Sequence, residues 1–314
     1  RIARLTSRGA VDTSFNPGTG FDNSVNALAV QGDGRVVVGG SFATCNGTAR
    51  VRLARLGVDG SLDATFNSGT GFNGTVSALV SQPDGKIVAG GSFSNVAGVT
   101  RPFVARLTGD GALDPTFGGT SGLNSSVLSL CLPEDGKLVA GGRFTAFTST
   151  ARPGLARLGS DGTLDADFSP ALRRAGTVFA LEHTAADYWI AGGSFDFVDD
   201  IACKNIVRFT SAGAVDTTFA TGTGFNSTVQ SLVLQPDGRI VAGGSFTTFN
   251  GATRNRIARL AADGSLDPSF NPGTGPNSTV QALLSLPDGR IVAGGSFTTF
   301  SGATRNRLVR LGAD

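Results

Sequence analysis

Charged residues recur along the chain in two columns whose spacing brings opposite charges together. The arginines stand 51 residues apart, at Arg4, Arg55, Arg106, Arg157, Arg208, Arg259 and Arg310. The aspartates follow across a short turn, at Asp12, Asp63, Asp114, Asp165, Asp216 and Asp267. A guanidinium that donates to such a carboxylate would orient two neighbouring strands and satisfy polar groups between sheets. Identical acids in every copy do not form the pair of unequal pKa that acid–base catalysis uses, so we predict a structural role.

Other catalytic chemistry is sparse. His183 is the only histidine, and no serine or cysteine nucleophile and no orienting acid can be matched to it. It shares a strand position with Val30, Leu132 and Leu234, so we interpret it as a core or channel residue. We therefore predict no catalytic residues and expect that the chain is not an enzyme.

Metal and disulfide chemistry are also poorly supported. Cys45, Cys131 and Cys203 are odd in number, contain no CxxC motif and have no histidine at metal-ligand spacing. Asp196, Asp199 and Asp200 offer carboxylates for a divalent cation, but their spacing matches no defined calcium loop. We expect thiols without a disulfide, no metal and no cofactor.

The best candidates for ligand binding lie where one copy of the repeat departs from the others, at about residues 169–209. Its two loops are expected on the same face. They carry the candidate binding residues Arg173, Arg174, Asp199, Asp200 and Lys204. The only tryptophan, Trp189, stands in an apolar column, so we interpret it as core rather than as a sugar platform.

A second candidate surface is an arginine column on the same loops. Its members are Arg50, Arg101, Arg152, Arg254 and Arg305, and only Cys203 interrupts it. Such a set would bind an anionic glycan, lipopolysaccharide or carboxylate through several guanidinium groups. The alternative is that each arginine lies along its own repeat with its head in water. On the opposite face, adjacent turn acids are expected to neutralise a basic column at Arg35, Lys86, Lys137, Arg239 and Arg290.

These residues are positioned by a repeat of 51 residues. The motif Gly-Gly-(Ser/Arg)-Phe begins at Gly39, Gly90, Gly141, Gly192, Gly243 and Gly294. A period of about 40 to 50 residues without helical patterning is typical of propeller blades. In the fifth hairpin copy we expect strands at Val229–Leu234, Arg239–Phe246, Arg256–Leu260 and Ser265–Phe270, joined by Gly, Asp and Asn turns. The sequence therefore predicts an all-β fold, a six-bladed β-propeller of four-stranded antiparallel blades, as a single domain over residues 1–314.

Two phenylalanine columns are expected to form the core, and paired glycines to let neighbouring sheets approach closely. Phenylalanine closes strand four at Phe15, Phe66, Phe117, Phe168, Phe219 and Phe270. It closes strand two at Phe42, Phe93, Phe144, Phe195, Phe246 and Phe297. The glycines lack a Cβ and also permit positive φ where the chain bends.

Both ends of the chain carry the pattern of the third strand, so one such strand is surplus. We expect the ring to close by pairing of N- and C-terminal strands, with Val11–Phe15 joining the blade built from Val280–Phe297. Arg307–Leu311 is expected to fill the slot between them because its loop is short, and Arg1–Leu5 to be displaced. The chain begins partway through a repeat, which suggests a piece of a longer, processed array.

The repeat resembles the delta-60 family of bacterial propeller-like proteins. The resemblance rests on Gln-Pro-Asp-Gly-Lys-Ile-Val-Ala-Gly-Gly-Ser-Phe at Gln82–Phe93, followed by Arg-Leu and Asp-Gly-(Ser/Ala)-Leu-Asp-x-x-Phe, and it covers essentially the whole chain. The double glycine is similar to that of kelch repeats, whose other aromatic positions are not matched. The resemblance implies a secreted or cell-surface bacterial protein in a repeat array, without a defined activity.

Composition excludes several classes of partner. A net charge of +2, from 26 basic and 24 acidic residues, gives no field that would require nucleic acid, and no apolar run is long enough to span a membrane. The leading hypothesis is a non-enzymatic extracellular or cell-surface adhesion propeller that binds a protein or glycan through its loop face. The alternatives are an architectural array segment without a ligand, supported by the near identity of residues 228–263 and 279–314, or a propeller hydrolase or lyase.

Overall fold

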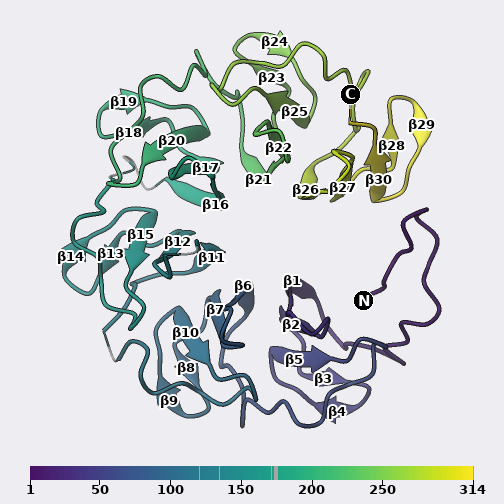
Figure 1. Ribbon diagram of the computed structural model, residues 1–314, viewed down its shortest axis with the longest axis vertical. Coiled ribbons are helices and arrows are strands. Elements are labelled where there is room, and N and C mark those ends of the chain that lie inside the picture. Colours follow the sequence, from purple (N-terminus) through teal and green to yellow (C-terminus); the bar gives the residue numbers. More distant parts are fainter. Residues whose placement is uncertain (120, 134, 171, 173–175, 314) are drawn as a thin grey trace. The chain divides into compact units, whose positions relative to one another are not determined.

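The structure is a computed structural model that describes residues 1–119, 121–133, 135–170, 172 and 176–313. The chain forms two compact units, which are described separately: residues 1–151 with 156–165, and residues 152–155 with 166–314. Strands are the regular elements of both units, and six copies of one arrangement follow each other along the chain (Figure 1). Each copy supplies a three-stranded antiparallel sheet and a separate two-stranded hairpin.

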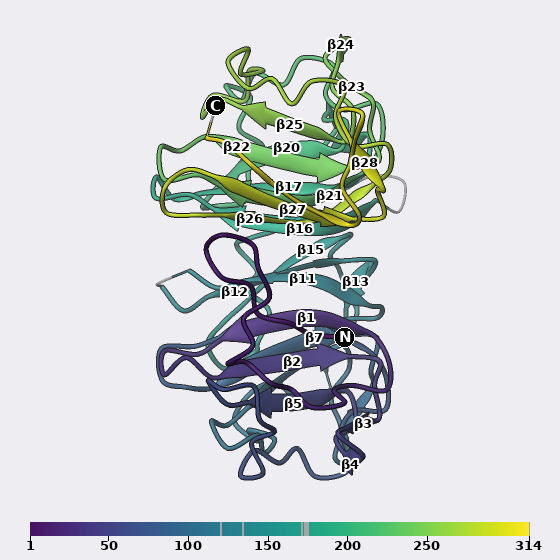
Figure 2. The ribbon, with the colours of Figure 1, turned by 90° about the vertical axis from the view of Figure 1, so that its right-hand side faces the viewer.

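The three-stranded sheets recur with nearly constant bounds. The first three are β1 (Val25–Val30), β2 (Val36–Gly40) and β5 (Leu53–Leu56); β6 (Val76–Ser81), β7 (Ile87–Gly91) and β10 (Val104–Leu107); and β11 (Val127–Cys131), β12 (Leu138–Gly142) and β15 (Leu155–Leu158). The last three are β16 (Thr177–His183), β17 (Tyr188–Ser194) and β20 (Ile206–Thr210); β21 (Val229–Leu234), β22 (Ile240–Gly244) and β25 (Ile257–Leu260); and β26 (Val280–Ser285), β27 (Ile291–Gly295) and β30 (Leu308–Leu311). In each sheet the strand with the double glycine is central, as β2 is between β1 and β5 (Figure 2).

The polar loop after the double glycine forms the two-stranded hairpin. The six hairpins are β3 (Thr44–Cys45) with β4 (Thr48–Ala49), β8 (Asn95–Val96) with β9 (Val99–Thr100), β13 (Ala146–Phe147) with β14 (Thr150–Ala151), β18 (Phe197–Val198) with β19 (Ile201–Ala202), β23 (Thr248–Phe249) with β24 (Ala252–Thr253), and β28 (Thr299–Phe300) with β29 (Ala303–Thr304). An isolated bridge ties each hairpin to the loop that enters its repeat, as Phe225 bridges Phe249. This bridge positions the loops that carry the candidate binding residues.

The expected fourth strand is reduced to a single bridge. In the fifth hairpin copy Leu266 bridges Leu260, and the chain then leaves the sheet. The cause is local, because Asp267 Oδ1 accepts hydrogen bonds from the backbone N of Ser269 at 2.9 Å and from its hydroxyl at 2.7 Å. An aspartate side chain that bonds two residues ahead folds the backbone into a turn instead of a ladder. Each sheet therefore has three strands and not the four that we predicted.

Within each unit the core lies between successive sheets. Val37 of the first sheet packs with Val76 and Ile87 of the second, and Ile190 of the fourth packs with Ile240 of the fifth. All twelve phenylalanines of the two columns are buried, as predicted. The apolar area that they remove from water is the main stabilising contribution to such a fold.

The double glycine allows this packing, but through close approach alone. A Cβ on Gly90 would lie 2.5 Å from Val127 Cγ1 of the next repeat, and a Cβ on Gly91 would lie 2.0 Å from the carbonyl oxygen of Thr75. Neither glycine has a positive φ, so that part of the prediction was wrong. The first glycine makes room for the neighbouring sheet, and the second makes room for its own entry loop.

The two terminal segments differ in their pairing. The C-terminal strand β30 pairs with β27, as predicted for Arg307–Leu311. Leu5 is not displaced from Val11 as we expected, because these two residues bridge each other. The partner of Val11 is therefore the third-strand segment of its own repeat.

Candidate functional site

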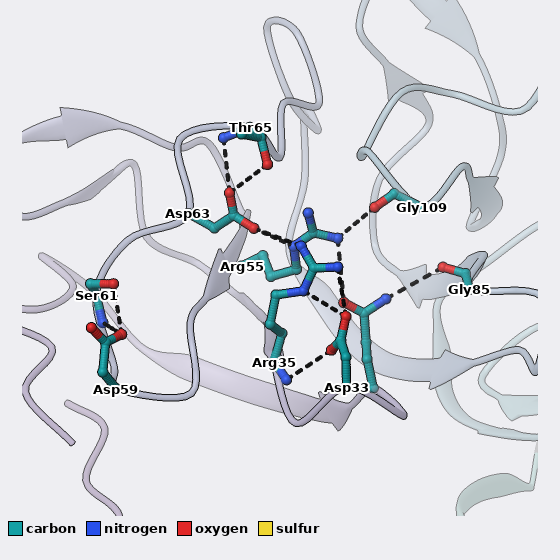
Figure 3. Close-up of polar contacts among 10 residues, drawn as sticks. Asp33, Arg35, Arg55, Asp59, Ser61, Asp63, Thr65, Gly85 and Gly109 are labelled. Carbon is teal, nitrogen blue, oxygen red and sulfur yellow. Dashed lines mark hydrogen bonds and ion pairs between the residues drawn. The ribbon is translucent and has the colours of Figure 1, made fainter. Parts of the chain in front are cut away.

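The arginine and aspartate columns pair in every repeat, as predicted. In the second repeat Arg55 Nε donates to Asp63 Oδ2 at 2.8 Å, and the other oxygen of Asp63 accepts from the backbone N of Thr65 at 2.9 Å and from its hydroxyl at 2.6 Å (Figure 3). The six pairs are Arg4–Asp12, Arg55–Asp63, Arg106–Asp114, Arg157–Asp165, Arg208–Asp216 and Arg259–Asp267. Burial opposes ionisation of Asp63, but the hydrogen bonds from Thr65 and Arg55 outweigh it and hold the pKa of this carboxyl well below its usual range. A carboxylate that stays ionised and fully engaged is a structural group.

The same arginines link successive repeats, which the sequence did not reveal. The Arg55 guanidinium lies 4.7 Å from the ring of Phe66, and its Nη1 donates to the carbonyl of Gly109, 54 residues further on (Figure 3). The same bond recurs from Arg4 to Val58, from Arg106 to Ser160, from Arg208 to Ala262 and from Arg259 to Ala313. We call this bond the inter-repeat clamp. It explains why arginine and not lysine stands in the column, since one planar head serves an acid, an aromatic ring and a carbonyl.

The basic column on the turns is neutralised, as expected. Arg35 pairs with Asp33 at 2.6 Å and with Asp63 at 3.2 Å. Adjacent acids also pair with Lys86, Arg239 and Arg290. This face therefore offers little uncompensated positive charge to a ligand.

The fourth repeat lacks that ion pair and has a cavity at the same place. Tyr188 replaces the basic residue, and the Arg208 guanidinium lies 4.6 Å from its ring and 4.7 Å from the ring of Phe219. A cavity of about 420 Å³ beside this stack is lined mainly by apolar groups, including Ile190, Leu234 and Tyr188. Tyr188 interrupts the basic column in the sequence, but we predicted no cavity there.

The arginines of the loop column lie along their own repeats. Arg101 is 8% exposed and Arg152 is 7% exposed. Arg101 Nη1 donates to the carbonyl of Thr100 at 2.8 Å, and Arg152 Nη2 donates to the carbonyl of Ala166 at 3.2 Å. Arg50, Arg254 and Arg305 each donate to the carbonyl of the preceding residue. These guanidinium groups are used by the backbone, which favours the structural interpretation of the column.

The candidates of the divergent repeat lie around one hairpin. Arg173 and Arg174 are outside the described residues. Asp199 and Asp200 form the turn between β18 and β19 with φ of 46° and 69°, and Lys204 is exposed just after β19. Leu172 of the entry loop bridges Val198, so the described part of this loop contacts the divergent hairpin.

A second cavity opens at this hairpin, where Cys203 interrupts the arginine column. Its volume is about 260 Å³, and its walls include Cys203, Val207, Val215, Thr217 and Phe219. Burial, and to a smaller degree the charge of Asp199, raise the pKa of the Cys203 thiol to about 11. The thiol is therefore protonated at neutral pH and is a poor nucleophile. The interrupted column was the sequence signal that could have located this cavity.

His183 and its neighbours have a different environment from the one expected. His183 is hydrogen-bonded to Asp187, with Nε2 2.9 Å from Oδ1, so the expectation that no acid could be matched to it was wrong. Asp187 lies in the turn after β16, a four-residue spacing that we did not consider. Trp189 is 2% exposed and packs against His183, which confirms its core position. Burial raises the pKa of Glu182 to about 7. The residues at the equivalent position of the other repeats are apolar or cysteine.

Two further properties limit the chemistry of the described part of the chain. Its His, Cys, Asp and Glu side chains form no group of three or more with the geometry for a metal ion. It also contains no helix with the length and apolar character needed to cross a bilayer.

Comparison with solved structures shows the fold. The extracellular domain of a hybrid two-component system from B. thetaiotaomicron matches with a TM-score of 0.58 and 14% identity, over 92% of this chain and 34% of that one. A structure described as the extracellular domain of a one-component system from the same organism matches with a TM-score of 0.57 and 16% identity, over the same shares of the two chains. This chain thus spans about a third of those proteins. A gluconolactonase from Xanthomonas campestris matches with a TM-score of 0.50 and 14% identity, over 88% of this chain and 84% of that one.

Comparison with protein families gives a more specific result. No curated protein matches the chain. Six segments match a family described as a domain of unknown function (DUF5122) β-propeller, at residues 31–66, 82–117, 134–168, 189–219, 235–270 and 286–314. Together they cover more than half of the chain, one segment per repeat. The resemblance to delta-60 repeats is thereby confirmed, and the chain is an all-β propeller of six repeats that belongs to the DUF5122 β-propeller family.

Proposed function

We propose that this chain is a non-enzymatic extracellular or cell-surface binding module that recognises a protein or glycan through the loops of its fourth repeat. The observation that carries the proposal is the cavity at Cys203. It opens at the point where the sequence departs from an otherwise uniform repeat, and it lies beside the charged turn of Asp199 and Asp200. Concave sites with a few polar groups on rigid elements are the usual places for ligands.

The comparisons support an extracellular location. Two of the similar structures are described as extracellular domains. The match covers only 34% of each of their chains. We propose that this chain serves in a similar setting, as one part of a larger surface protein. A hydrolytic function is less well supported, because the aspartates of the repeat column are engaged in ion pairs with arginine and the Cys203 thiol is protonated.

An exchange of one loop tests the proposal. Residues 196–204 are replaced with residues 247–255 of the next repeat, and the purified chain is screened against a glycan array and by pull-down from cell-surface extracts. Binding that is present in the wild type and lost in the exchange variant supports the proposal. The matched control makes the same exchange at residues 43–51 of the first repeat, which should leave binding intact. A ligand that both variants retain would place the site elsewhere.

An architectural function is the second candidate, because the inter-repeat clamp joins successive repeats within each unit regardless of any ligand. Such a segment would show no ligand in the screen, and removal of one clamp should lower its stability.

We also propose that the six repeats close into a ring through their terminal strands. Residues 6–15 duplicate the segment that follows the third strand in each repeat and can supply it for the sixth, if Val11 exchanges its bridge to Leu5 for one to Leu311. Cysteines at positions 11 and 311 should then form a disulfide, and failure to crosslink argues against closure.

A further inference from the structure

The cavity beside Tyr188 lies at a position that recurs in the fold. It is bounded by the turn between β16 and β17 and the turn between β21 and β22. A cavity of about 380 Å³ lies at the equivalent place between the first and second repeats, where its walls include Asp33 and Arg35 (Figure 3). In the fourth repeat Ala186 and Tyr188 replace this acid and this base. The same position of the fold is therefore charged in one repeat and mainly apolar in another.

The turn after β16 also lacks a side chain that joins successive turns elsewhere. After β1, Gln31 Nε2 donates to the carbonyl of Gly85 at 3.4 Å. After β21, Gln235 Nε2 donates to the carbonyl of Gly289 at 2.6 Å. In both cases the acceptor lies 54 residues further along the chain, in the next turn of the same kind. Thr184 stands at the glutamine position after β16.

Threonine leaves the space of the glutamine amide open. The Thr184 hydroxyl accepts a hydrogen bond from the backbone N of Tyr188 at 3.1 Å, within its own turn, and the side chain is too short to reach the next turn. The carbonyl that corresponds to those of the other two bonds belongs to Gly238, which lines the cavity. It accepts no hydrogen bond within the part of the chain that the structure describes. A ligand with an N–H or O–H group can therefore replace the missing amide donor.

The other walls of the cavity suit an uncharged, apolar molecule. Ile190, Leu234 and Ile240 line it together with the turns. Of the described residues that line it, Arg208 alone is charged, and its Nη2 lies 2.7 Å from Oδ2 of Asp216. A charged ligand would lose its hydration here without gaining a counter-charge.

The size and the rim of the cavity favour a small molecule over a protein segment. Its volume is about 420 Å³, whereas an apolar cavity of about 150 Å³ already holds benzene, so a molecule of two fused rings fits. The exposed residues at the rim are Ala185, Ala186, Pro236 and Ala262. None of them offers the large apolar or aromatic side chain that typically anchors a protein interface.

We propose that the cavity between the turns after β16 and β21 binds a small, uncharged aromatic molecule with one N–H or O–H donor, of about the size of indole. The rings contact Tyr188, Ile190 and Leu234, and the donor bonds to the carbonyl of Gly238. Contact with the tyrosine ring adds to the burial of apolar area. Tyr188 begins β17, whereas hairpin β18–β19 follows the other end of that strand, so this inference does not depend on the proposed function.

Titration of the unmodified chain tests the inference. Binding of indole and of 1-methylindole is followed by NMR shifts of the amides of residues 184–190 and 234–240. We expect saturable binding of indole and about fivefold or more weaker binding of 1-methylindole, because the methyl group removes the donor to Gly238. N-acetyl-tryptophan amide should bind more weakly than indole. Tighter binding of this amide would assign the cavity to a polypeptide partner and overturn the inference.

Three substitutions make the test specific. Thr184→Gln restores the side chain of the neighbouring turn, which should fill the cavity and abolish indole binding, while Thr184→Ser keeps the space open and should preserve it. Gln31→Thr is the matched control, since it opens the equivalent space where Asp33 and Arg35 remain, and it should add no second indole site. The NMR spectrum of each variant shows whether it is folded. No saturable binding of indole, equal affinity for the two indoles, a second site in Gln31→Thr, or undiminished binding in a folded Thr184→Gln variant would overturn the inference.

Discussion

Arg259 and Asp267 form an ion pair that is removed from water on all sides. Nε and Oδ2 lie 2.8 Å apart, and the two side chains are 2% and 7% exposed. The same pair in the first segment, Arg4 and Asp12, has the same 2.8 Å separation but is 42% and 26% exposed. One sequence motif therefore occurs in a buried and an exposed form within one chain.

Breaking the buried pair should be costly. Asp267→Asn leaves the Arg259 guanidinium buried without its counter-charge, and we expect the free energy of unfolding to fall by about 3 kcal/mol. Urea unfolding followed by circular dichroism measures the change. Asp12→Asn is the matched control and should cause a much smaller loss, since water and salt screen exposed pairs. Equal losses in the two variants would contradict the account.

Acid should destabilise the protein through the same carboxyls. The pKa values of Asp63 and Asp114 are held well below the ordinary value of 3.8, because hydrogen bonds from threonine and arginine outweigh the effect of burial. For a depressed folded-state pKa, the stabilisation is fully present above the unfolded value and is lost as the pH falls below it. The contribution of these two carboxyls to the urea midpoint should therefore be nearly level from pH 7 to 5 and fall steeply below about pH 4. Asp63→Asn should flatten this fall.

Glu182 should have the opposite pH dependence. Burial raises its pKa to about 7 from 4.5, so the folded state binds more protons than the unfolded state between these values. Stability attributable to this residue declines as the pH rises from 4.5 to 7 and stays low above that. Glu182→Gln should stabilise the protein at pH 8 by about 2 kcal/mol, and by almost nothing at pH 4. Thermal unfolding at the two pH values measures the difference, and the same gain at both would show that the charge is not responsible.

The first glycine of the double-glycine motif should not accept a side chain. A Cβ on Gly90 would lie 2.5 Å from Val127 Cγ1, so Gly90→Ala forces two sheets apart and should cost about 2 kcal/mol. Gly32→Ala is the control, since a Cβ there meets no atom within 4 Å and the backbone φ is not positive. Val127→Ala should partly rescue Gly90→Ala. Additive losses in the double variant would indicate that the two residues do not press on each other.

The sequence by itself determined the features that every repeat shares. The 51-residue period, the burial of the phenylalanine columns and the pairing of Arg55 with Asp63 were all predictable, because each recurs in an equivalent environment. Arg55 and Asp63 are eight residues apart and meet across one turn, so their contact needs little tertiary information. The propeller architecture follows from the period and the absence of helical patterning.

The tertiary structure decided how those residues are used and where space remains. Asp267 turns the backbone after a single bridge, so a segment that reads as a strand is not one; the competition between a side-chain bond and a ladder is decided by local geometry. The clamp joins Arg55 to a carbonyl 54 residues away, and the cavity at Cys203 opens where the arginine column is interrupted. The first depends on which atoms of successive repeats face each other, and the second on how residues 201–222 pack. Sequence periodicity identifies equivalent positions, whereas only packing in three dimensions determines the distances and empty volumes between them.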